Sequence, residues 1–238
     1  MSYLNTRPLL YGIENSEIAD RIELIRDYPS EIAAKLLNNT IDIGLVPVSV
    51  IPQMKENYIV TDYCIGCDGP VASVCLFSDV PIDSVERVLL DYQSRTSVAL
   101  AKLLLKEYWE VDPELVDTSS EYQSQIKGST AGLLIGDRAL SQRVRSKYIY
   151  DMGAAWKDHT GLPFVFAAWV SNKKLPEEFV NLFDRANAKG LTKIDEIVAS
   201  NPSDIFDLKK YFTEFISYRL DEEKKKGMKL FLEKIKEF

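Results

Sequence analysis

The sequence predicts an α/β protein of two lobes with a ligand cleft between them. Apolar stretches of strand length alternate with amphipathic helices along the chain, which is typical of α/β folds. Two of these stretches, residues 71–78 and 164–171, are longer than an average strand and bracket a middle segment. If both strands cross between lobes, residues 1–76 and 170–238 form one lobe and residues 77–169 form the other. A cleft between such lobes is a natural site for a small molecule.

The length and charge of the chain argue against a nucleic-acid-binding or membrane-spanning protein. A chain of 238 residues, 46% of them hydrophobic, can bury a sizeable core. Its net charge of −7 argues against a nucleic-acid-binding surface, and the lysines at 224–226, which follow acidic residues, predict a solvated helix face. No apolar run approaches the roughly 18 residues that span a bilayer, and the start lacks the pattern of an export signal. We therefore expect a cytoplasmic protein.

The first nine residues combine polar side chains with a proline. Pro8 fixes its own φ and disfavours the α region for Arg7, so we expect an extended or turning segment up to that point. From Leu9 onward the chain can form a short helix, with Pro8 tolerated near its first turn. A polar loop between a strand end and a helix start is where open α/β folds bind their ligands. An ordinary polar terminus is the alternative interpretation.

The next stretch predicts a βαβ unit. Residues 22–26 alternate weakly between apolar and polar side chains and suit a short strand. Ser30 is positioned to cap a helix whose apolar residues follow at helical spacing. Residues 41–49 form a β-branched apolar run that predicts a buried parallel strand, stopped by Pro47.

The rest of the chain continues the alternation of strands and helices. Turn residues precede the strand at 71–78, and a mostly buried helix is expected at 97–109. From Pro176 on, apolar residues recur at helical spacing. The other strands are predicted at residues 88–91, 131–137, 148–152 and 164–170.

Three cysteines, Cys64, Cys67 and Cys75, raise the question of a metal or redox site. The spacing of the first two is found in redox pairs and in half of a zinc site. A structural zinc needs four ligands, and the remaining soft candidates are Cys75 and the single histidine, His159, which is remote in sequence. We therefore expect reduced thiols and no metal.

Residues 91–97 carry several hydroxyl groups and Arg95 at the junction of a strand and a helix. The amides at a helix N-terminus, together with the hydroxyls of Thr96 and Ser97, can bind an anion, and Arg95 can form a paired contact with a carboxylate. A helix N-cap by Ser94 or Thr96 explains the same residues. Both interpretations stay open on this motif alone.

Further polar residues lie at or inside predicted strands: Ser49, Ser73, Gly136 and Asp137. A buried serine satisfied by the backbone is the usual explanation for such a residue. Together with the polar residues of the first segment, they would supply hydroxyls, amides and guanidinium groups to one small carboxylated ligand. The residues of that first segment are Tyr3, Asn5, Thr6 and Arg7.

The sequence offers few groups for acid–base or nucleotide chemistry. His159 is the single histidine and has no supporting motif, so a Ser–His–Asp set is excluded. The GxGxxG and Walker patterns are absent, which argues against a nucleotide cofactor. From the residues alone, the chain is predicted to bind a small anion between two lobes, and no reaction is specified.

Several runs of the sequence strongly resemble one family, in the same order and over nearly the whole chain. The family is the chorismate dehydratases of the futalosine route to menaquinone, which have a type II periplasmic-binding-protein fold with the ligand cleft between two lobes. The runs are SYLNTRPL (2–9), DIGLVPVS (42–49), GPVASV (69–74) with LFS (76–78), SRTS (94–97), GDRAL (136–140), and DMG (151–153) through Trp156 to TGLPFVFAAW (160–169).

The resemblance implies that the protein removes water from chorismate to give 3-[(1-carboxyvinyl)oxy]benzoate, with no cofactor and no obligate protein partner. On that reading Thr96, Ser97 and the start of their helix would hold one carboxylate of this dicarboxylate substrate, with Ser49 and Ser73 nearby. The reaction ends in an aromatic ring, so the protein mainly has to hold its substrate, stabilise developing charge and exclude water.

The same resemblance implies a catalytic role for Asn5, which would face the reacting carbons. An amide is a poor base, so we expect Asn5 to orient the substrate and donate hydrogen bonds. Asp137 is the alternative ionisable candidate, and its other interpretation is an N-cap for a helix at 138–145.

Two features depart from the family pattern, and two other functions compete. Relatives carry a short apolar strand ahead of SYLNT, where this sequence has Met1 alone, and Cys64 and Cys67 do not belong to the pattern. A transporter's solute-binding protein would share the fold but carry an export signal. A 1,4-dihydroxy-6-naphthoate synthase would also share it but relies on a histidine, and the context of His159 argues against that role.

Overall fold

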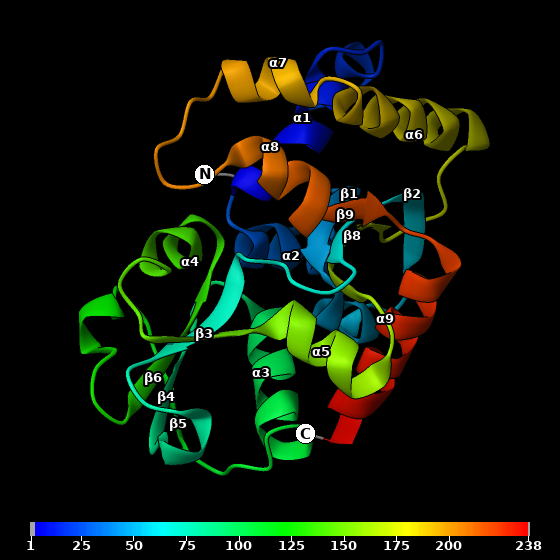
Figure 1. The fold of residues 1–238 in the computed structure, drawn as a ribbon. Coiled ribbons are helices and arrows are strands. Elements are labelled where there is room, and N and C mark those ends of the chain that lie inside the picture. Colours follow the sequence, from blue (N-terminus) through cyan, green and yellow to red (C-terminus); the bar gives the residue numbers. More distant parts are fainter. Residues whose placement is uncertain (1–2, 238) are drawn as a thin grey trace.

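The computed structural model describes residues 3–237 and contains two β-sheets with helices packed on them (Figure 1). The four-stranded sheet has the order β1-β8-β2-β9, and the five-stranded sheet has the order β5-β4-β6-β3-β7. The first sheet consists of β1 (Ile43–Pro47), β2 (Tyr58–Cys67), β8 (Phe164–Ser171) and β9 (Ser217–Arg219). The second consists of β3 (Val74–Ser78), β4 (Arg87–Leu90), β5 (Glu114–Asp117), β6 (Thr130–Ile135) and β7 (Tyr148–Asp151). The predicted two-lobed α/β fold is confirmed.

The chain passes between the sheets at residues 68–73 and 161–163. The whole of β3 pairs with β6 and β7 in the second sheet, and the whole of β8 pairs with β1 and β2 in the first. The prediction that these two strands cross between lobes is therefore wrong. β3 begins at Val74, so residues 71–73 of the predicted strand belong to the connection that makes the first crossing. The predicted boundaries at residues 76 and 170 cut through both strands.

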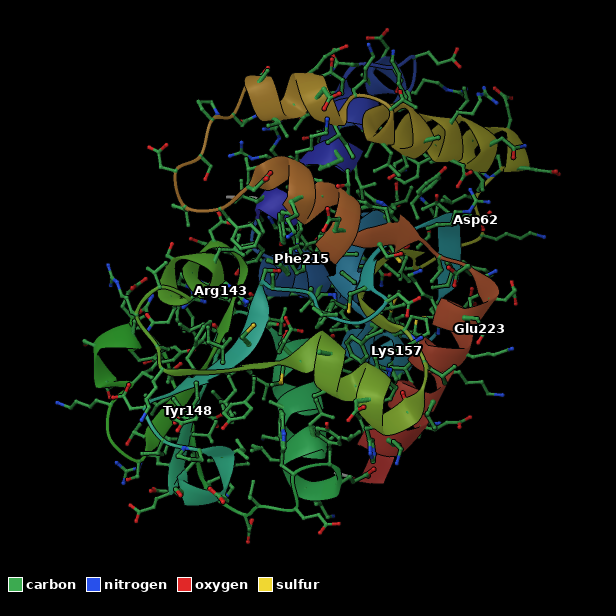
Figure 2. The ribbon with its side chains drawn as sticks, in the orientation of Figure 1. Asp62, Arg143, Tyr148, Lys157, Phe215 and Glu223 are labelled. Carbon is green, nitrogen blue, oxygen red and sulfur yellow. The ribbon has the colours of Figure 1, made fainter. Side chains whose placement is uncertain are left out.

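The first crossing is fixed from the second sheet. Arg143, which follows the α4 helix, extends toward it and donates a hydrogen bond from Nη1 to the carbonyl oxygen of Ala72 at 3.2 Å (Figure 2). Ala72 has φ 60, a left-handed conformation that residues with a side chain rarely adopt. The first crossing is therefore a tight turn that the Arg143 hydrogen bond stabilises.

The βαβ unit predicted near the N-terminus is not formed. Residues 22–26 pair with no strand and lie in an irregular segment. β1 is present but pairs antiparallel with β8, whereas a parallel strand was predicted. β2 was not predicted at all, because register shifts interrupt its pairing and its apolar alternation. The short strands β5 and β9 also lacked a sequence signal.

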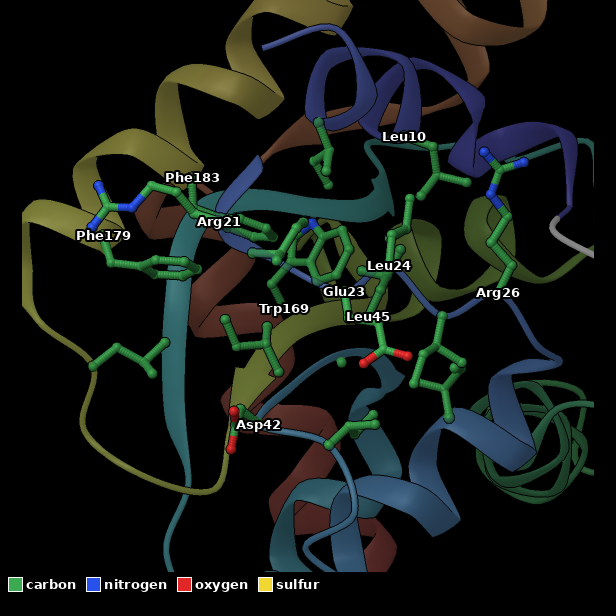
Figure 3. A pocket seen from close by; sticks show the side chains of 18 of the residues that line it. Leu10, Arg21, Glu23, Leu24, Arg26, Asp42, Leu45, Trp169, Phe179 and Phe183 are labelled. Carbon is green, nitrogen blue, oxygen red and sulfur yellow. The ribbon is translucent and has the colours of Figure 1, made fainter. Parts of the chain in front are cut away.

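A cavity of about 600 Å³ lies between the irregular segment and β1 (Figure 3). Consecutive residues of 21–27 line one side and consecutive residues of 41–45 line the other, so the backbones of both stretches border it. Trp169 of β8 and the side chains of Phe179 and Phe183 add an apolar wall. This cavity keeps the segment apart from β1, which remains the edge strand of its sheet.

Helices pack on both sheets, and those predicted at 97–109 and from Pro176 are confirmed. They are α1 (Arg7–Glu14), α2 (Pro29–Leu37), α3 (Arg95–Glu107), α4 (Gly136–Gln142), α5 (Met152–Thr160), α6 (Glu177–Leu191), α7 (Ile194–Ala199), α8 (Leu208–Lys210) and α9 (Glu222–Lys234). Among residues 3–237, none of the helices combines the length and the apolar character that crossing a membrane requires.

Two expectations about helix ends need correction. α2 begins at Pro29, so Ser30 lies in its first turn and does not cap it. Lys224 was predicted on a solvated face, yet only 2% of it is exposed. Its ammonium group donates to Asp221 at 2.8 Å, and the Asp221 carboxylate also accepts from the Lys224 amide, which makes Asp221 the N-cap of α9. Local pairing, which sequence periodicity does not reveal, allows this lysine to be buried.

Close packing of α1 on α6 positions the start of the chain. Gly12 and Gly190 lie where the two helices touch, and a Cβ atom at either position would overlap backbone of the other helix. At Gly190 the obstructing atom is the carbonyl oxygen of Pro8, one turn from the polar N-terminal segment. Glycine is required here by space, since neither residue has a positive φ.

We expect Gly190→Ala to lower the free energy of unfolding by about 1–3 kcal/mol, since overpacking against backbone forces the helices apart. Urea denaturation of the variant and of Arg185→Ala, an exposed position on the same helix, measures this loss. In an unobstructed helix the glycine replacement would instead add about 1 kcal/mol. A neutral or stabilised variant would show that the helices do not meet as described.

Candidate active site

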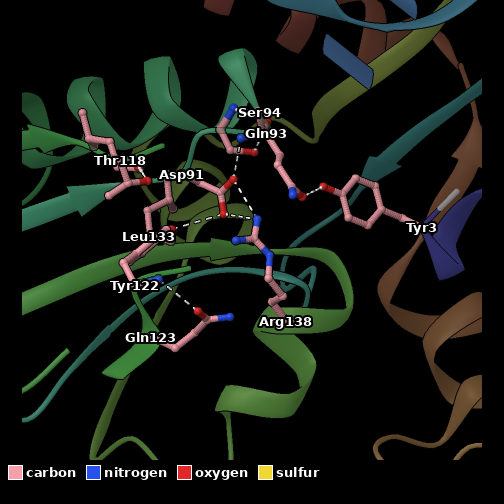
Figure 4. Close-up of polar contacts among 11 residues, drawn as sticks. Tyr3, Asp91, Gln93, Ser94, Thr118, Tyr122, Gln123, Leu133 and Arg138 are labelled. Atoms are coloured by element: carbon pink, nitrogen blue, oxygen red, sulfur yellow. Dashed lines mark hydrogen bonds and ion pairs between the residues drawn. The ribbon is translucent and has the colours of Figure 1, made fainter. Parts of the chain in front are cut away.

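Several of the polar residues singled out in the sequence make contacts between the two lobes. Tyr3 extends from the N-terminal segment toward the second sheet, where its hydroxyl group donates to the side-chain oxygen of Gln93 (Figure 4). The Tyr3 ring packs against Gly136, where a Cβ atom would overlap it. The amide of Leu4 donates to Asp137 Oδ1 at 3.3 Å. Residues 90 to 133 positions apart in the chain are thus in direct contact.

The N-terminal segment is helical rather than extended. Leu4–Thr6 forms a 3-10 turn that runs directly into α1, and Thr6 Oγ1 donates to the carbonyl oxygen of Tyr3 at 2.8 Å. Arg7 has φ −55 and ψ −45, so the prediction that Pro8 excludes it from the α region is wrong. Pro8 lies in the first turn of α1, as expected. Met1 and Ser2, the first residue of the SYLNT motif, lie outside the described residues.

The helix-cap interpretation of residues 94–97 is confirmed for Ser94, and the anion-binding interpretation stays a prediction. Ser94 caps α3, since its Oγ accepts from the Ser97 amide at 3.1 Å. Thr96 reaches the other lobe instead: its Oγ1 accepts from the Ser49 amide at 3.2 Å and contacts the Ser49 hydroxyl at 3.1 Å. The first amides of a helix have no partner within it, so the start of α3 can still bind an anion. Arg95 is exposed.

Ser73 lies in the first crossing and is 1% exposed. Its hydroxyl oxygen accepts from the Tyr211 hydroxyl at 2.7 Å, and its carbonyl oxygen accepts from the Gly136 amide at 2.7 Å. The turn that carries it is anchored by Asp151, whose carboxylate accepts from the amides of Val71 at 3.0 Å and Ala72 at 2.8 Å. The same carboxylate caps α5. Ser73 therefore has a fixed position.

Asn5 and Asp137 face this region from opposite lobes. The Asn5 carbonyl oxygen accepts from the Tyr218 hydroxyl at 2.9 Å. Asp137 does not cap α4, because Ile135 holds the N-cap position. Burial raises the pKa of Asp137, against the opposing effects of the Leu4 amide and the charge of Arg7. A groove of about 480 Å³ beside Asp137 is lined by second-lobe residues between Glu121 and Arg145.

Sequence analysis missed a buried ion pair behind these residues. The Arg138 guanidinium donates through Nη2 to both carboxylate oxygens of Asp91, at 2.7 and 3.0 Å (Figure 4). Asp91 also accepts from the Gln93 amide at 2.8 Å and from the Tyr122 hydroxyl at 3.2 Å. Burial raises the pKa of Asp91 and the guanidinium opposes that rise. Because Gln93 bonds to Tyr3, the pair supports the contact between lobes.

Asp91 begins the polar stretch 91–97, and Arg138 lies in the GDRAL run at 136–140. Nothing in the sequence marks them as partners. Pairing of strand ends brings the two motifs together, since β4 and β6 are parallel neighbours. Tyr211 and Tyr218, which contact Ser73 and Asn5, carried no sequence signal beyond their apolar spacing.

The remaining candidates lie elsewhere. His159 lies on α5, where Nε2 is 3.4 Å from Glu107. Cys64 and Cys67 are buried in β2, and burial raises the pKa of the Cys64 thiol to about 12 and that of Cys67 well above its usual value. Within residues 3–237, no three histidine, cysteine or acidic side chains are grouped to hold a metal ion.

We expect Asp91→Asn to lower the free energy of unfolding by about 3 kcal/mol, because it leaves the largely buried Arg138 charge without a counterion. The control is Glu114→Gln, which breaks the exposed Arg87–Glu114 pair and should cost at most about 1 kcal/mol. Urea denaturation of both variants at neutral pH measures the difference. Equal losses would mean that the Asp91 pair contributes no more than a surface contact.

The chain is similar to known proteins over nearly its whole length. The sequence profile of a family described as menaquinone biosynthesis matches residues 1–237. The chain is 28% identical to a chorismate dehydratase of Thermus thermophilus, with 97% of this chain and 92% of the relative aligned. It is 26% identical to a chorismate dehydratase of Campylobacter jejuni, with 99% and 96% aligned.

The fold also matches a solved structure of a binding protein. The periplasmic aliphatic sulphonate binding protein of Escherichia coli superposes with a TM-score of 0.59 at 12% identity, covering 98% of this chain and 89% of that one. At this identity the likeness shows the fold alone, and it confirms the predicted periplasmic-binding-protein architecture. Given the profile match over nearly its full length, the chain belongs to the menaquinone biosynthesis family.

Proposed function

We propose that this protein is a chorismate dehydratase, a hydro-lyase that eliminates water from chorismate to give 3-[(1-carboxyvinyl)oxy]benzoate. The family and two relatives that bear this name support the proposal. The structural observation that carries it is a set of side-chain contacts between the two lobes, in which Thr96 bonds to Ser49 and Ser73 bonds to Tyr211. Such a set suits a small polar anion enclosed by two lobes.

The proposed reaction needs few acid–base side chains. The proton leaves the carbon that bears the enolpyruvyl ether, the hydroxyl group leaves the neighbouring carbon, and formation of the aromatic ring drives both losses. The protein's task is then to hold a dicarboxylate rigidly and to direct hydrogen-bond donors at developing charge. The described site supplies hydroxyls, amides and one partly buried carboxyl group, Asp137.

Each predicted residue has a role in this proposal. The start of α3 with Thr96 and Ser97 holds one substrate carboxylate, and the exposed Arg95 lies at the edge of that subsite. Asn5 orients the reacting carbons. Tyr3, Thr6 and Arg7 hold the segment that presents Asn5, and Gly136 gives the Tyr3 ring room to reach the second lobe. Ser49, Ser73 and Asp137 complete the lining from the two lobes.

Incubating the purified protein with chorismate, and following the loss of water by mass spectrometry, tests the proposal. We expect time-dependent formation of 3-[(1-carboxyvinyl)oxy]benzoate without added cofactor or metal. Chorismate that is bound reversibly but recovered unchanged would contradict an enzyme and favour a solute-binding function, which the fold also serves in the sulphonate-binding protein.

Asn5→Ala should lower kcat about a hundredfold, the cost of removing one well-placed hydrogen-bond donor from a transition state. The melting temperature should change little, because Tyr218 bonds to the Asn5 backbone, which the variant retains. Asn15→Ala, at the other end of α1, removes an exposed amide as the matched control. A fall in melting temperature as large as that of a core variant would mean that Asn5 is structural.

A further inference from the structure

The cavity between residues 21–27 and β1 is bordered on both sides by unpaired backbone. Among residues 3–237, no N–H or C=O group of residues 22–26 forms a hydrogen bond. On the other side, β1 is an edge strand, and in the described part of the chain no strand pairs with the edge that faces away from β8. Backbone polar groups require partners, so two rows of peptide groups beside one cavity indicate that it can receive a third.

Residues 22–26 already have features of a strand. Their side chains alternate weakly between apolar and polar, and Ile22 is extended, with φ −135 and ψ 155. β1 has five residues, as many as this segment, so the two rows match in length. Ile25, in the middle of the segment, is 41% exposed, which is unusual for a strand-like apolar residue in a sheet. The segment is therefore a strand that lacks a neighbour.

The walls of the cavity suit apolar side chains. Its volume of about 600 Å³ lies within the range of ligand pockets, and Leu45, Trp169, Phe179 and Phe183 line it (Figure 3). A small apolar molecule would fill this space and leave both rows of peptide groups unpaired. An extended peptide offers N–H and C=O groups along both edges and side chains to both faces, so it satisfies the walls and the backbone together.

The charges around the cavity specify the occupant further. Most charged residues of the lining are already in ion pairs, which are Arg21–Glu178, Arg26–Glu14, Asp27–Lys35 and Asp42–Lys173. Glu23 also lines the cavity, but it forms no ion pair or hydrogen bond with any residue that the structure describes. A basic side chain on the occupant, opposite Glu23, would complete the pairing.

We propose that this cavity is a docking site for an extended peptide segment of a partner protein, with apolar side chains and a basic residue opposite Glu23. The segment adds to the free edge of β1 and pairs on its other side with residues 22–26, which become the new edge strand. In such strand addition, main-chain hydrogen bonds give affinity and alternate side chains give specificity. The inference concerns the first lobe alone and does not rest on the proposed function.

Titration of the full chain with a synthetic peptide tests the inference. The peptide has about seven residues, an ordinary strand length, in which valine alternates with threonine around a central lysine. We expect it to raise the melting temperature and to slow hydrogen–deuterium exchange of residues 22–26 and of the β1 amides that point away from β8. A matched peptide with several prolines cannot donate these backbone hydrogen bonds and should do neither. No effect of the first peptide, or equal effects of both, would overturn the inference.

An exchange of charges tests the role of Glu23. A peptide with glutamate in place of the lysine should bind the wild-type protein about tenfold more weakly or worse, because like charges would then meet in the cavity. Glu23→Lys should reverse this preference. Glu31→Lys, at an exposed position of α2 outside the cavity lining, is the control and should leave the preference unchanged. A preference that Glu23→Lys does not reverse would contradict the proposed recognition.

The protein without peptide provides the last comparison. Light scattering reports its oligomeric state, and we expect residues 22–26 to exchange rapidly when no peptide is present. A dimer in which these amides are already protected would mean that a second copy of the chain occupies the cavity, and it would overturn the inference.

Discussion

The contact of the N-terminal segment with the second lobe is the constraint on which the site depends. Leu4 donates to Asp137 and the Tyr3 ring rests on Gly136, and these contacts hold the segment that carries Asn5 against the second lobe. The segment cannot slide, since α1 behind it is packed against α6 at glycine positions. Packing far from the chemistry therefore decides where the proposed catalytic amide lies.

The opposite side of the site is fixed by hydrogen bonds to one buried turn. One carboxylate, that of Asp151, accepts from two amides of the first crossing and caps α5, so a turn with a left-handed Ala72 is held in place. Ser73 follows directly and meets Tyr211 from the first lobe. In each lobe, contacts within the protein thus hold the backbone of the site residues in place. A site with few acid–base groups depends on such preorganised hydrogen-bond donors.

The positions of several candidate site residues could be predicted from the sequence, because a strand or helix and the polar residues at its end lie in one continuous stretch. The apolar run of β6 followed by Gly136 and Asp137, and the hydroxyls that begin α3, were found from pattern and turn chemistry. Predictions failed where side-chain pairing or packing, rather than periodicity, decides the outcome. Residues 22–26 alternate like a strand but border a cavity, and Lys224 is buried because Asp221 pairs with it. No local pattern reveals such partners, nor the Asp91–Arg138 pair.

The central claim is that chorismate binds between the sheets and not in the larger apolar cavity of the first lobe. Hydrogen–deuterium exchange of the wild-type protein, with and without saturating chorismate, tests it directly. We predict slower exchange of the amides at residues 71–73, 94–97 and 136–137, none of which lines the cavity. Residues 3–7 do not discriminate, because Tyr3 and Thr6 also line the cavity. Protection confined to residues 21–27 and 41–45, which border the cavity, would contradict the account.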